Sequence, residues 1–347
     1  MTLPLRPNYF KCPPLSGDEK DYLLTQAHRI CQETALNALT IVKNPTTKVV
    51  VNQCTKRRAQ LHYGTDIIDS NMYGITGKTQ IKTSYEELIE FFHLTSQKKV
   101  RTFGNVVGQA ILDRVTLYNL TDQTDDPSSA FIYAGVQWSV IECNVIHPSL
   151  TLKRDTCFLE VLNYITVSDP DTGEVRRGFI RAVHSLALDC CPSLRSTHNI
   201  VRSALVRSGH LFLETEQPGL FDYYYAYVVA DPGKTPKFFN IKVFQRIVGQ
   251  MLNLEHHIAL KRLPKLLQTA LNFPNRPYRS TKCIHYCEAC DAKFKMLHSK
   301  HHCFFCRQIV CTSCIQTYKV PVAGRERTKV EVCTECFCGN KPKRGIL

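Results

Sequence analysis

The 347-residue sequence has no apolar run long enough to span a bilayer, and its first 15 residues contain prolines where a secretion signal has an apolar core. These two absences predict a soluble, cytoplasmic protein in which thiols stay reduced. Its 17 cysteines also lack the spacing of a disulfide framework. We therefore expect paired cysteines in this chain to bind metal.

Sequence motifs of catalysis are missing as well. Residues 75–79 (ITGKT) look like the end of a phosphate-binding loop, but Met72 stands where that loop needs its first glycine. There is no GxSxG nucleophile motif, and scattered histidines such as His184 and His210 have no catalytic partner at motif spacing. We expect the protein not to be an enzyme.

Acidic residues are in deficit, with 30 Asp and Glu against 44 Lys and Arg, a formal charge of +14. The excess is concentrated in residues 276–347, which hold 14 basic and 5 acidic side chains. Eight metal-bound thiolates and two zinc ions would lower the charge of this segment to about +5. A compact basic module suits an anionic partner, either a lipid headgroup or nucleic acid.

Cysteine, in contrast, is abundant near the C-terminus, where four CxxC pairs follow one another. A CxxC turn directs two thiolates at one tetrahedral ion, so four pairs predict two closed zinc sites with no open position for catalysis. The two expected cofactors are therefore Zn²⁺ ions. The eight candidate ligands are Cys287, Cys290, Cys303, Cys306, Cys311, Cys314, Cys333 and Cys336.

The first 275 residues predict an α+β fold. Ser16 is expected to cap a helix that ends before Asn44, and Ser84 a short helix that reaches His93. A long amphipathic helix is expected over residues 240–260. Segments rich in β-branched and aromatic residues favour antiparallel strands over 48–51, 56–63, 73–82, 112–120, 131–142, 156–167, 178–189, 200–213 and 220–230.

Three passages carry a family resemblance: residues 131–140 (FIYAGVQWSV), 153–155 (KRD) and 227–237 (YVVADPGKTPK). With them, residues 16–262 resemble the START lipid-binding family. The resemblance implies a helix-grip fold, in which a curved antiparallel sheet and a long C-terminal helix enclose a cavity for one hydrophobic lipid.

The same resemblance suggests residues for the cavity wall. Trp138, Arg154 and the run Tyr223–Tyr225 would face the cavity if the fold is that of the family. Alternatively, they are core, ion-pair and sheet-surface residues, since aromatic side chains usually serve packing.

The spacing between the CxxC pairs carries a second resemblance. Twelve, four and eighteen residues separate successive pairs, and a Lys-His-His run precedes the second pair. Residues 278–338 therefore resemble a FYVE-type zinc finger, rather than a RING, which usually includes a ligating histidine. We expect a small cross-braced two-zinc finger over 283–338, after a linker over 263–282 and before a basic tail over 339–347.

The FYVE resemblance implies how the ligands are shared and what the finger binds. Cys287, Cys290, Cys311 and Cys314 would hold one zinc ion, and Cys303, Cys306, Cys333 and Cys336 the other. Lys300, His301 and His302 match the middle of the basic run that binds phosphatidylinositol 3-phosphate on endosomal membranes.

Several arginines of that family are replaced here. Ser299, Phe304 and Glu331 stand at three of these positions, and losing bidentate donors should weaken headgroup binding. Met296 and Leu297 match the loop that enters the bilayer in the family, or else cover the zinc core.

Two functions from different classes follow. In the first, the finger targets a phosphoinositide-containing endosomal membrane, while the START-like domain binds a hydrophobic lipid. In the second, the finger is a scaffold for protein partners without phosphoinositide specificity. Binding of nucleic acid is less favoured, because no base-reading helix is recognisable in the sequence.

Overall fold

The structure is a computed structural model that describes residues 3–121, 131–142, 152–169, 173–230, 236–271, 277–295, 299–322 and 325–339. The chain forms two compact units. The first unit comprises Met1–Val50 and Arg58–Leu252, and the second comprises Val51–Arg57 and Asn253–Leu347.

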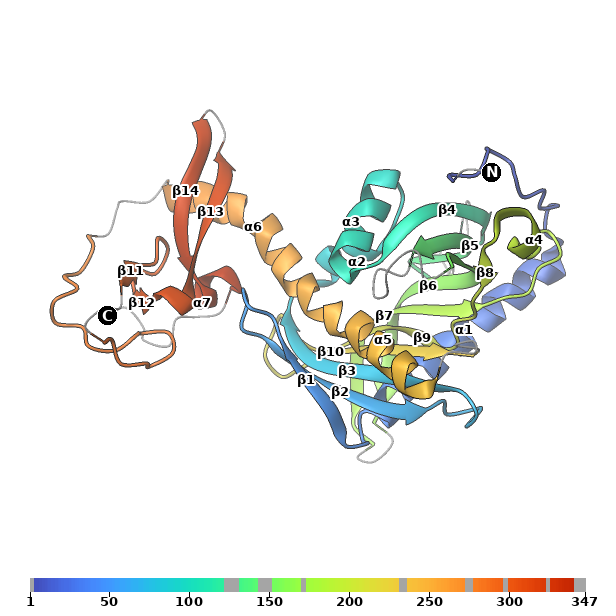
Figure 1. Cartoon of the computed structure of the whole chain (residues 1–347), viewed down its shortest axis with the longest axis horizontal. Coiled ribbons are helices and arrows are strands. Elements are labelled where there is room, and N and C mark those ends of the chain that lie inside the picture. Colours follow the sequence, from blue (N-terminus) through green and yellow to red (C-terminus); the bar gives the residue numbers. More distant parts are fainter. Residues whose placement is uncertain are drawn as a thin grey trace. The chain divides into compact units, whose positions relative to one another are not determined.

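A curved sheet of 10 strands forms the first unit (Figure 1). Its order is β1-β2-β3-β10-β9-β7-β6-β5-β4, and a short strand, β8, pairs with β6 in parallel. The strands are β1 (Thr46–Val51), β2 (Arg58–Thr65), β3 (Tyr73–Lys82), β4 (Ala110–Asn119), β5 (Tyr133–Glu142), β6 (Arg154–Ser168), β7 (Val175–Ser185), β8 (Val201–Arg202), β9 (Ser208–Glu214) and β10 (Leu220–Val229). Along this order, from β2 through to β4 at the far edge, each strand pairs with its neighbour in antiparallel register.

One face of the sheet is covered by α1 (Gly17–Ile41). Ser16 caps this helix in a capping box with Glu19, as the sequence predicts. The apolar stripe of α1 packs against alternate residues of the central strands, and the single tryptophan, Trp138, is fully buried in this layer. This is the main hydrophobic core of the first unit.

The opposite face is covered by α2 (Tyr85–Phe92), α3 (Gln97–Val107) and α5 (Lys237–Gly249), while the one-turn α4 (Arg195–His198) lies outside this layer. Ser84 caps α2 in a second capping box, with Glu87, as predicted. Helix α5 approaches β3 so closely that a Cβ at Gly77 would lie 2.7 Å from Val248 Cγ1. The ITGKT sequence is therefore a strand with a glycine at a helix contact, and its likeness to a phosphate loop is accidental.

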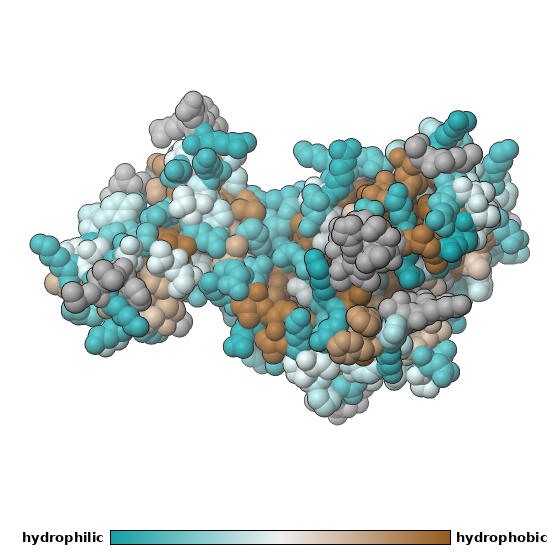
Figure 2. All heavy atoms as spheres, viewed as in Figure 1, coloured by the Kyte–Doolittle hydropathy of each residue, from teal (hydrophilic) through white to brown (hydrophobic). Residues whose placement is uncertain are grey.

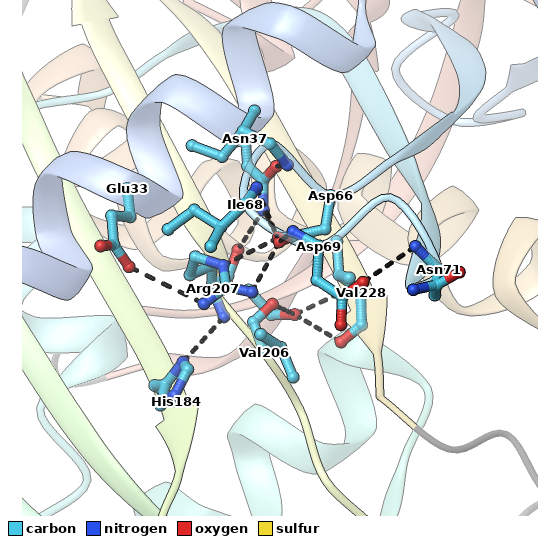
Figure 3. Close-up of polar contacts among 12 residues, drawn as sticks. Glu33, Asn37, Asp66, Ile68, Asp69, Asn71, His184, Val206, Arg207 and Val228 are labelled. Carbon is cyan, nitrogen blue, oxygen red and sulfur yellow. Dashed lines mark hydrogen bonds and ion pairs between the residues drawn. The ribbon is translucent and has the colours of Figure 1, made fainter.

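A buried polar network fixes the sheet edge beneath α1 (Figure 3). Arg207 donates to Asp66 through Nε at 2.8 Å and through Nη2 at 2.5 Å, and Asn37 Nδ2 donates to the same carboxylate at 2.6 Å. His184 Nδ1 accepts the backbone N–H of Arg207 at 3.2 Å. These contacts hold Arg207 at a φ of 42°, a conformation that non-glycine residues rarely adopt.

The second unit contains a long helix and two small hairpins. Its elements are α6 (Asn253–Leu271), β11 (Lys300–His302), β12 (Ile309–Cys311), the 3₁₀ turn η3 (Thr312–Cys314), β13 (Ile315–Val322), β14 (Arg325–Cys333) and α7 (Thr334–Phe337). Strand β11 pairs with β12 and β13 with β14, both antiparallel. The hairpins bring the cysteine pairs together.

The α+β class is confirmed, but two helix predictions need correction. The single helix expected over 240–260 is two helices, because the chain tightens into a 3₁₀ turn (η2, Gln250–Leu252) between α5 and α6. Helix α6 then continues past Pro264 to Leu271, into the segment expected to be a linker. Helix α3 was not predicted at all.

Hydrophobic side chains appear at the surface in separate patches among hydrophilic ones (Figure 2). Among the described residues, no helix combines the length and the hydropathy needed to cross a membrane.

Candidate metal centre and ligand hollows

The structure brings the eight paired cysteines into two groups of four. Within each group the sulfur atoms all lie within 4.8 Å of one another. The groups are interleaved along the chain, as the FYVE resemblance implies: Cys287, Cys290, Cys311 and Cys314 form one, and Cys303, Cys306, Cys333 and Cys336 form the other.

Distances within the groups fit zinc. The sulfurs of Cys290 and Cys311 are 3.8 Å apart, and those of Cys306 and Cys333 are 3.7 Å apart. A tetrahedron with Zn–S bonds of about 2.3 Å has edges of about 3.8 Å. Four thiolates around each position leave no coordination site for substrate, so both groups fit closed structural Zn²⁺ sites.

The first two CxxC turns share one local backbone geometry. The residue after each of the first two pairs, Asp291 or Arg307, has a left-handed φ near 60°. Its N–H donates back to the carbonyl of the first cysteine of the pair, at 2.8 Å to Cys287 and 3.0 Å to Cys303. Glycine adopts this conformation most readily; here aspartate and arginine adopt it.

Backbone N–H groups also approach the sulfurs. The N–H of Cys311 lies 3.3 Å from Cys287 Sγ, and that of Cys333 lies 3.3 Å from Cys303 Sγ. Such donors stabilise thiolate charge around a metal.

Helix α6 completes the core of this unit. Leu263 and Leu267 on α6 are buried against the β13–β14 hairpin and Phe337 of α7. Arg57 donates to Glu255 of α6 at 3.0 and 2.6 Å, which ties the short segment 51–57 to the same helix. Residues N-terminal to the cysteine frame are therefore part of the second unit.

An open hollow of about 430 Å³, here called the finger hollow, lies beside the second cysteine group. It is lined by Tyr278, Lys300, His301, His302, Phe304, Lys329, Val330 and Glu331. The structure therefore gathers the three residues predicted for the headgroup into one depression.

Sequence reasoning missed Lys329. It stands two residues before Glu331 on β14, so both side chains lie on one face of the strand. Charged side chains at alternate positions before Cys333 were the sequence signal that could have identified Lys329.

The predicted headgroup residues already have contacts within the finger. Lys300 Nζ donates to the carbonyl of Thr281 at 2.8 Å, and His302 Nε2 donates to that of Arg279 at 2.9 Å. His301 Nδ1 donates to Glu331 at 3.2 Å, while its buried Nε2 has no hydrogen-bond partner among the described residues. Glu331 thus places a negative charge among the basic side chains of the finger hollow.

Arg307 lies near the finger hollow but faces aromatic rings. Its guanidinium is 4.2 Å from the ring centre of Tyr278 and 5.0 Å from that of Phe304. Met296 and Leu297, predicted to enter the bilayer, lie outside the described residues.

A second hollow, of about 100 Å³, lies in the first unit between α3 and the sheet and is here called the sheet hollow. Phe103, Phe158, Tyr225 and Tyr227 supply its aromatic wall, and Arg154 lines it too. A larger hollow of about 290 Å³ lies next to it, between the C-terminal end of α3 and helix α5. Gln109 lines both.

The residues suggested for a cavity divide between the two faces of the sheet. Arg154 and Tyr225 line the sheet hollow, and Tyr223 lies on the same face, stacked on Phe212 at 4.3 Å. Trp138 and Tyr224 belong to the core beneath α1, where Trp138 Nε1 donates to Asp155 at 2.8 Å. For these two the packing interpretation was right.

Comparison with known proteins identifies the C-terminal module. The family model of the FYVE zinc finger matches residues 278–341. Among curated proteins, a lateral signaling target protein 2 homolog from Brugia malayi is 40% identical over 52 residues, which are 15% of this chain and 8% of that protein. The match thus spans less than a tenth of that relative.

Solved structures similar to this chain include two human proteins. Human StAR-related lipid transfer protein 5 shows 12% identity and a TM-score of 0.45, over 67% of this chain and 97% of that one. Human STARD10 shows 14% identity and a TM-score of 0.43, over 75% and 86% of the two chains. The FYVE resemblance stated from the sequence is thus found again in a family model.

Proposed function

We propose that this chain, whose residues 278–341 match the FYVE zinc finger, is a non-enzymatic, peripheral membrane protein that binds lipid. Its finger, loaded with two Zn²⁺ ions on the eight paired cysteines, holds it on membranes that contain phosphatidylinositol 3-phosphate, on the cytoplasmic face of endosomes. The first unit takes up a hydrophobic ligand. The observation that carries the proposal is the finger hollow beside the zinc frame.

The chemistry of the finger hollow supports an anionic partner. Two ammonium groups, from Lys300 and Lys329, and two imidazoles converge there against the one carboxylate of Glu331. Ammonium and imidazolium groups donate charge-assisted hydrogen bonds to phosphate oxygens. Basic side chains near an anionic surface each add about 1 kcal/mol of attraction.

A second group of residues suited to membrane contact lies in the segment between Lys293 and β11. Lys293 and Lys295 are exposed, and Met296 and Leu297 follow them in sequence. We propose that these two apolar side chains enter the bilayer while the lysines lie at the headgroups.

Flotation of the zinc-loaded full chain tests the targeting step. Phosphatidylcholine vesicles with and without phosphatidylinositol 3-phosphate are compared at equal surface charge, with phosphatidylserine as the balance. We expect flotation to depend on the phosphoinositide, and the affinity for those vesicles to fall roughly 30-fold in Lys300→Gln/Lys329→Gln, since two basic contacts of about 1 kcal/mol each are lost.

Lys282→Gln is the matched control, because Lys282 is exposed on the same finger and does not line the hollow. Flotation with any anionic vesicle would reduce the finger to a general electrostatic anchor. No flotation at all would favour the scaffold function, in which the departures from the FYVE basic run have removed lipid specificity.

A further inference from the structure

The walls of the sheet hollow are more basic than a purely apolar ligand requires. Three guanidinium groups line it, those of Arg114, Arg154 and Arg181, and none of its described lining residues is acidic. Behind them lies one carboxylate, Glu160, which is 2% exposed. It accepts from Arg181 Nε at 2.9 Å and is also paired with Arg114.

One carboxylate cannot neutralise three cations. Burial raises the pKa of Glu160, but the charges and hydrogen bonds of Arg114 and Arg181 outweigh it, so the pKa lies below its usual value and the group is ionised. Arg154 has no recorded ion-pair partner in the described part of the chain. The cluster therefore carries a formal charge of +2, which is costly in a half-enclosed site unless an anion joins it.

Neighbouring groups do not offset this charge. His210, on the same face of the sheet, is fully buried, and burial together with Arg181 lowers its pKa well below its usual value, so it is neutral. The Arg181 guanidinium also lies 4.9 Å from the ring centre of Phe103, which shields it from water on the α3 side.

Hydroxyl groups stand beside the unpaired guanidinium. Ser139 on β5 is the cross-strand partner of Thr156 on β6, and Arg154 lies two residues before Thr156. The three side chains therefore project from one face of the sheet into the same hollow. Neither hydroxyl has a recorded side-chain hydrogen bond within the described residues, so a guanidinium and two O–H donors converge on one space.

We propose that the sheet hollow binds the anionic head, a phosphate monoester or a carboxylate, of an amphiphilic ligand. This rests on the proposed lipid binding of the first unit and names the class of lipid. A volume of about 100 Å³ admits a head group but not a whole lipid, since pockets for drug-sized ligands measure about 300–1,000 Å³. The adjoining hollow of about 290 Å³ between α3 and α5, which shares Gln109 with the sheet hollow, offers space for the rest of the ligand.

Extraction of lipid by the full chain tests this proposal. The protein is incubated with phosphatidylcholine vesicles that contain an equal minor fraction of phosphatidic acid, oleic acid or cholesterol, and bound lipid is measured by mass spectrometry after the vesicles are removed. We expect preferential loading of phosphatidic acid or oleic acid. Arg154→Gln should reduce that loading roughly 10- to 100-fold, the loss of one charge-assisted contact.

Arg177→Gln is the matched control, because Arg177 on β7 is 78% exposed and does not line the hollow. Thr156→Val supplies a second variant that keeps the charge and removes one hydroxyl; its loading of the anionic lipids should fall severalfold. Extraction of cholesterol or phosphatidylcholine in preference, unchanged in Arg154→Gln, would overturn the anion site while leaving lipid binding intact.

A second experiment, with inorganic phosphate in place of lipid, tests the anion site independently of lipid binding. The thermal unfolding midpoint is compared in inorganic phosphate and in chloride at equal ionic strength. If no vesicle lipid is extracted but phosphate stabilises the wild-type chain and not Arg154→Gln, the anion site stands and the lipid-binding proposal fails. No lipid loading together with no phosphate effect would overturn both.

Discussion

At the scale of single residues, the finger hollow contains its own competitor for an anion. Glu331 accepts a hydrogen bond from His301, one of the residues predicted to contact the headgroup. A bound phosphate must therefore be placed beside a carboxylate or displace it, and the two negative charges repel each other. Glu331, which stands where the FYVE resemblance expects an arginine, is therefore expected to oppose binding of an anion in the finger hollow.

Removing that charge should strengthen membrane binding. Glu331→Gln is expected to raise the affinity of the full chain for vesicles with phosphatidylinositol 3-phosphate about fivefold, since one charge near the membrane surface corresponds to about 1 kcal/mol. Vesicle titration measures the change. Glu335→Gln, in the same module but outside the finger hollow, should leave affinity unchanged, and equal affinities for Glu331→Gln and wild type would refute this role of the carboxylate.

Two histidines, the half-buried His184 and the buried His210, predict sensitivity to acid in the first unit. Burial, with the nearby charges of Arg207 and Arg29, lowers the pKa of His184 to about 4, and the pKa of His210 lies well below its usual value. The unfolded chain, with histidine pKa values near 6.5, takes up more protons below that pH. The free energy of unfolding is then full above pH 6.5 and falls as pH drops toward 4.

The single tryptophan provides the measurement, because Trp138 is buried in the first unit and its fluorescence reports that unit. Denaturant titrations between pH 7 and 5 should show a loss of about 1 kcal/mol per pH unit for each neutral histidine. His184→Gln keeps an acceptor for the N–H of Arg207 and should flatten the dependence. The same slope in wild type and variant would exclude His184 as a source.

At the scale of elements, local sequence signals predict those helices and strands whose ends they mark. The caps at Ser16 and Ser84 located α1 and α2, and β-branched and aromatic residues located β3 with its observed bounds. Helix α3 was missed although Ser96 caps it and Gly108, with a φ of 67°, ends it. Its apolar residues Val100, Phe103 and Val107 have helical spacing that could have been recognised.

Tertiary packing overrode the local signal at Pro264. Proline in a helix interior removes a hydrogen bond and usually ends the helix, so a linker was expected from residue 263. The burial of Leu263 and Leu267 against the β13–β14 hairpin offsets that cost. Such a contact between distant segments cannot be found from one sequence, whereas the CxxC spacing placed all eight thiols because metal geometry constrains it locally.

Adjacent leucines of α6 test whether this helix belongs to the finger. Leu267 is fully buried and Leu266 is 41% exposed. Leu267→Ala should lower stability by about 2–5 kcal/mol and speed the release of zinc to a chromogenic chelator. Leu266→Ala should do neither. If the two variants release zinc at the same rate as the wild type, α6 is not needed to hold the zinc frame.

At the scale of the whole molecule, the chain combines a basic zinc finger with a sheet whose covered face contains buried arginines. Basic side chains thus gather at two places, the finger hollow and the sheet hollow. Composition indicated the first of these. The second depends on side chains that the sheet register brings together from β4, β6 and β7, and no spacing in the sequence announces it.

One measurement tests most directly whether the two activities belong to one function. A fluorescent phosphatidic acid is placed in vesicles with or without phosphatidylinositol 3-phosphate, and its uptake by the zinc-loaded full chain is followed over time. The account predicts faster uptake from vesicles that contain the phosphoinositide, and no such difference in Lys300→Gln/Lys329→Gln. Equal uptake from both vesicles by the wild-type chain would contradict it.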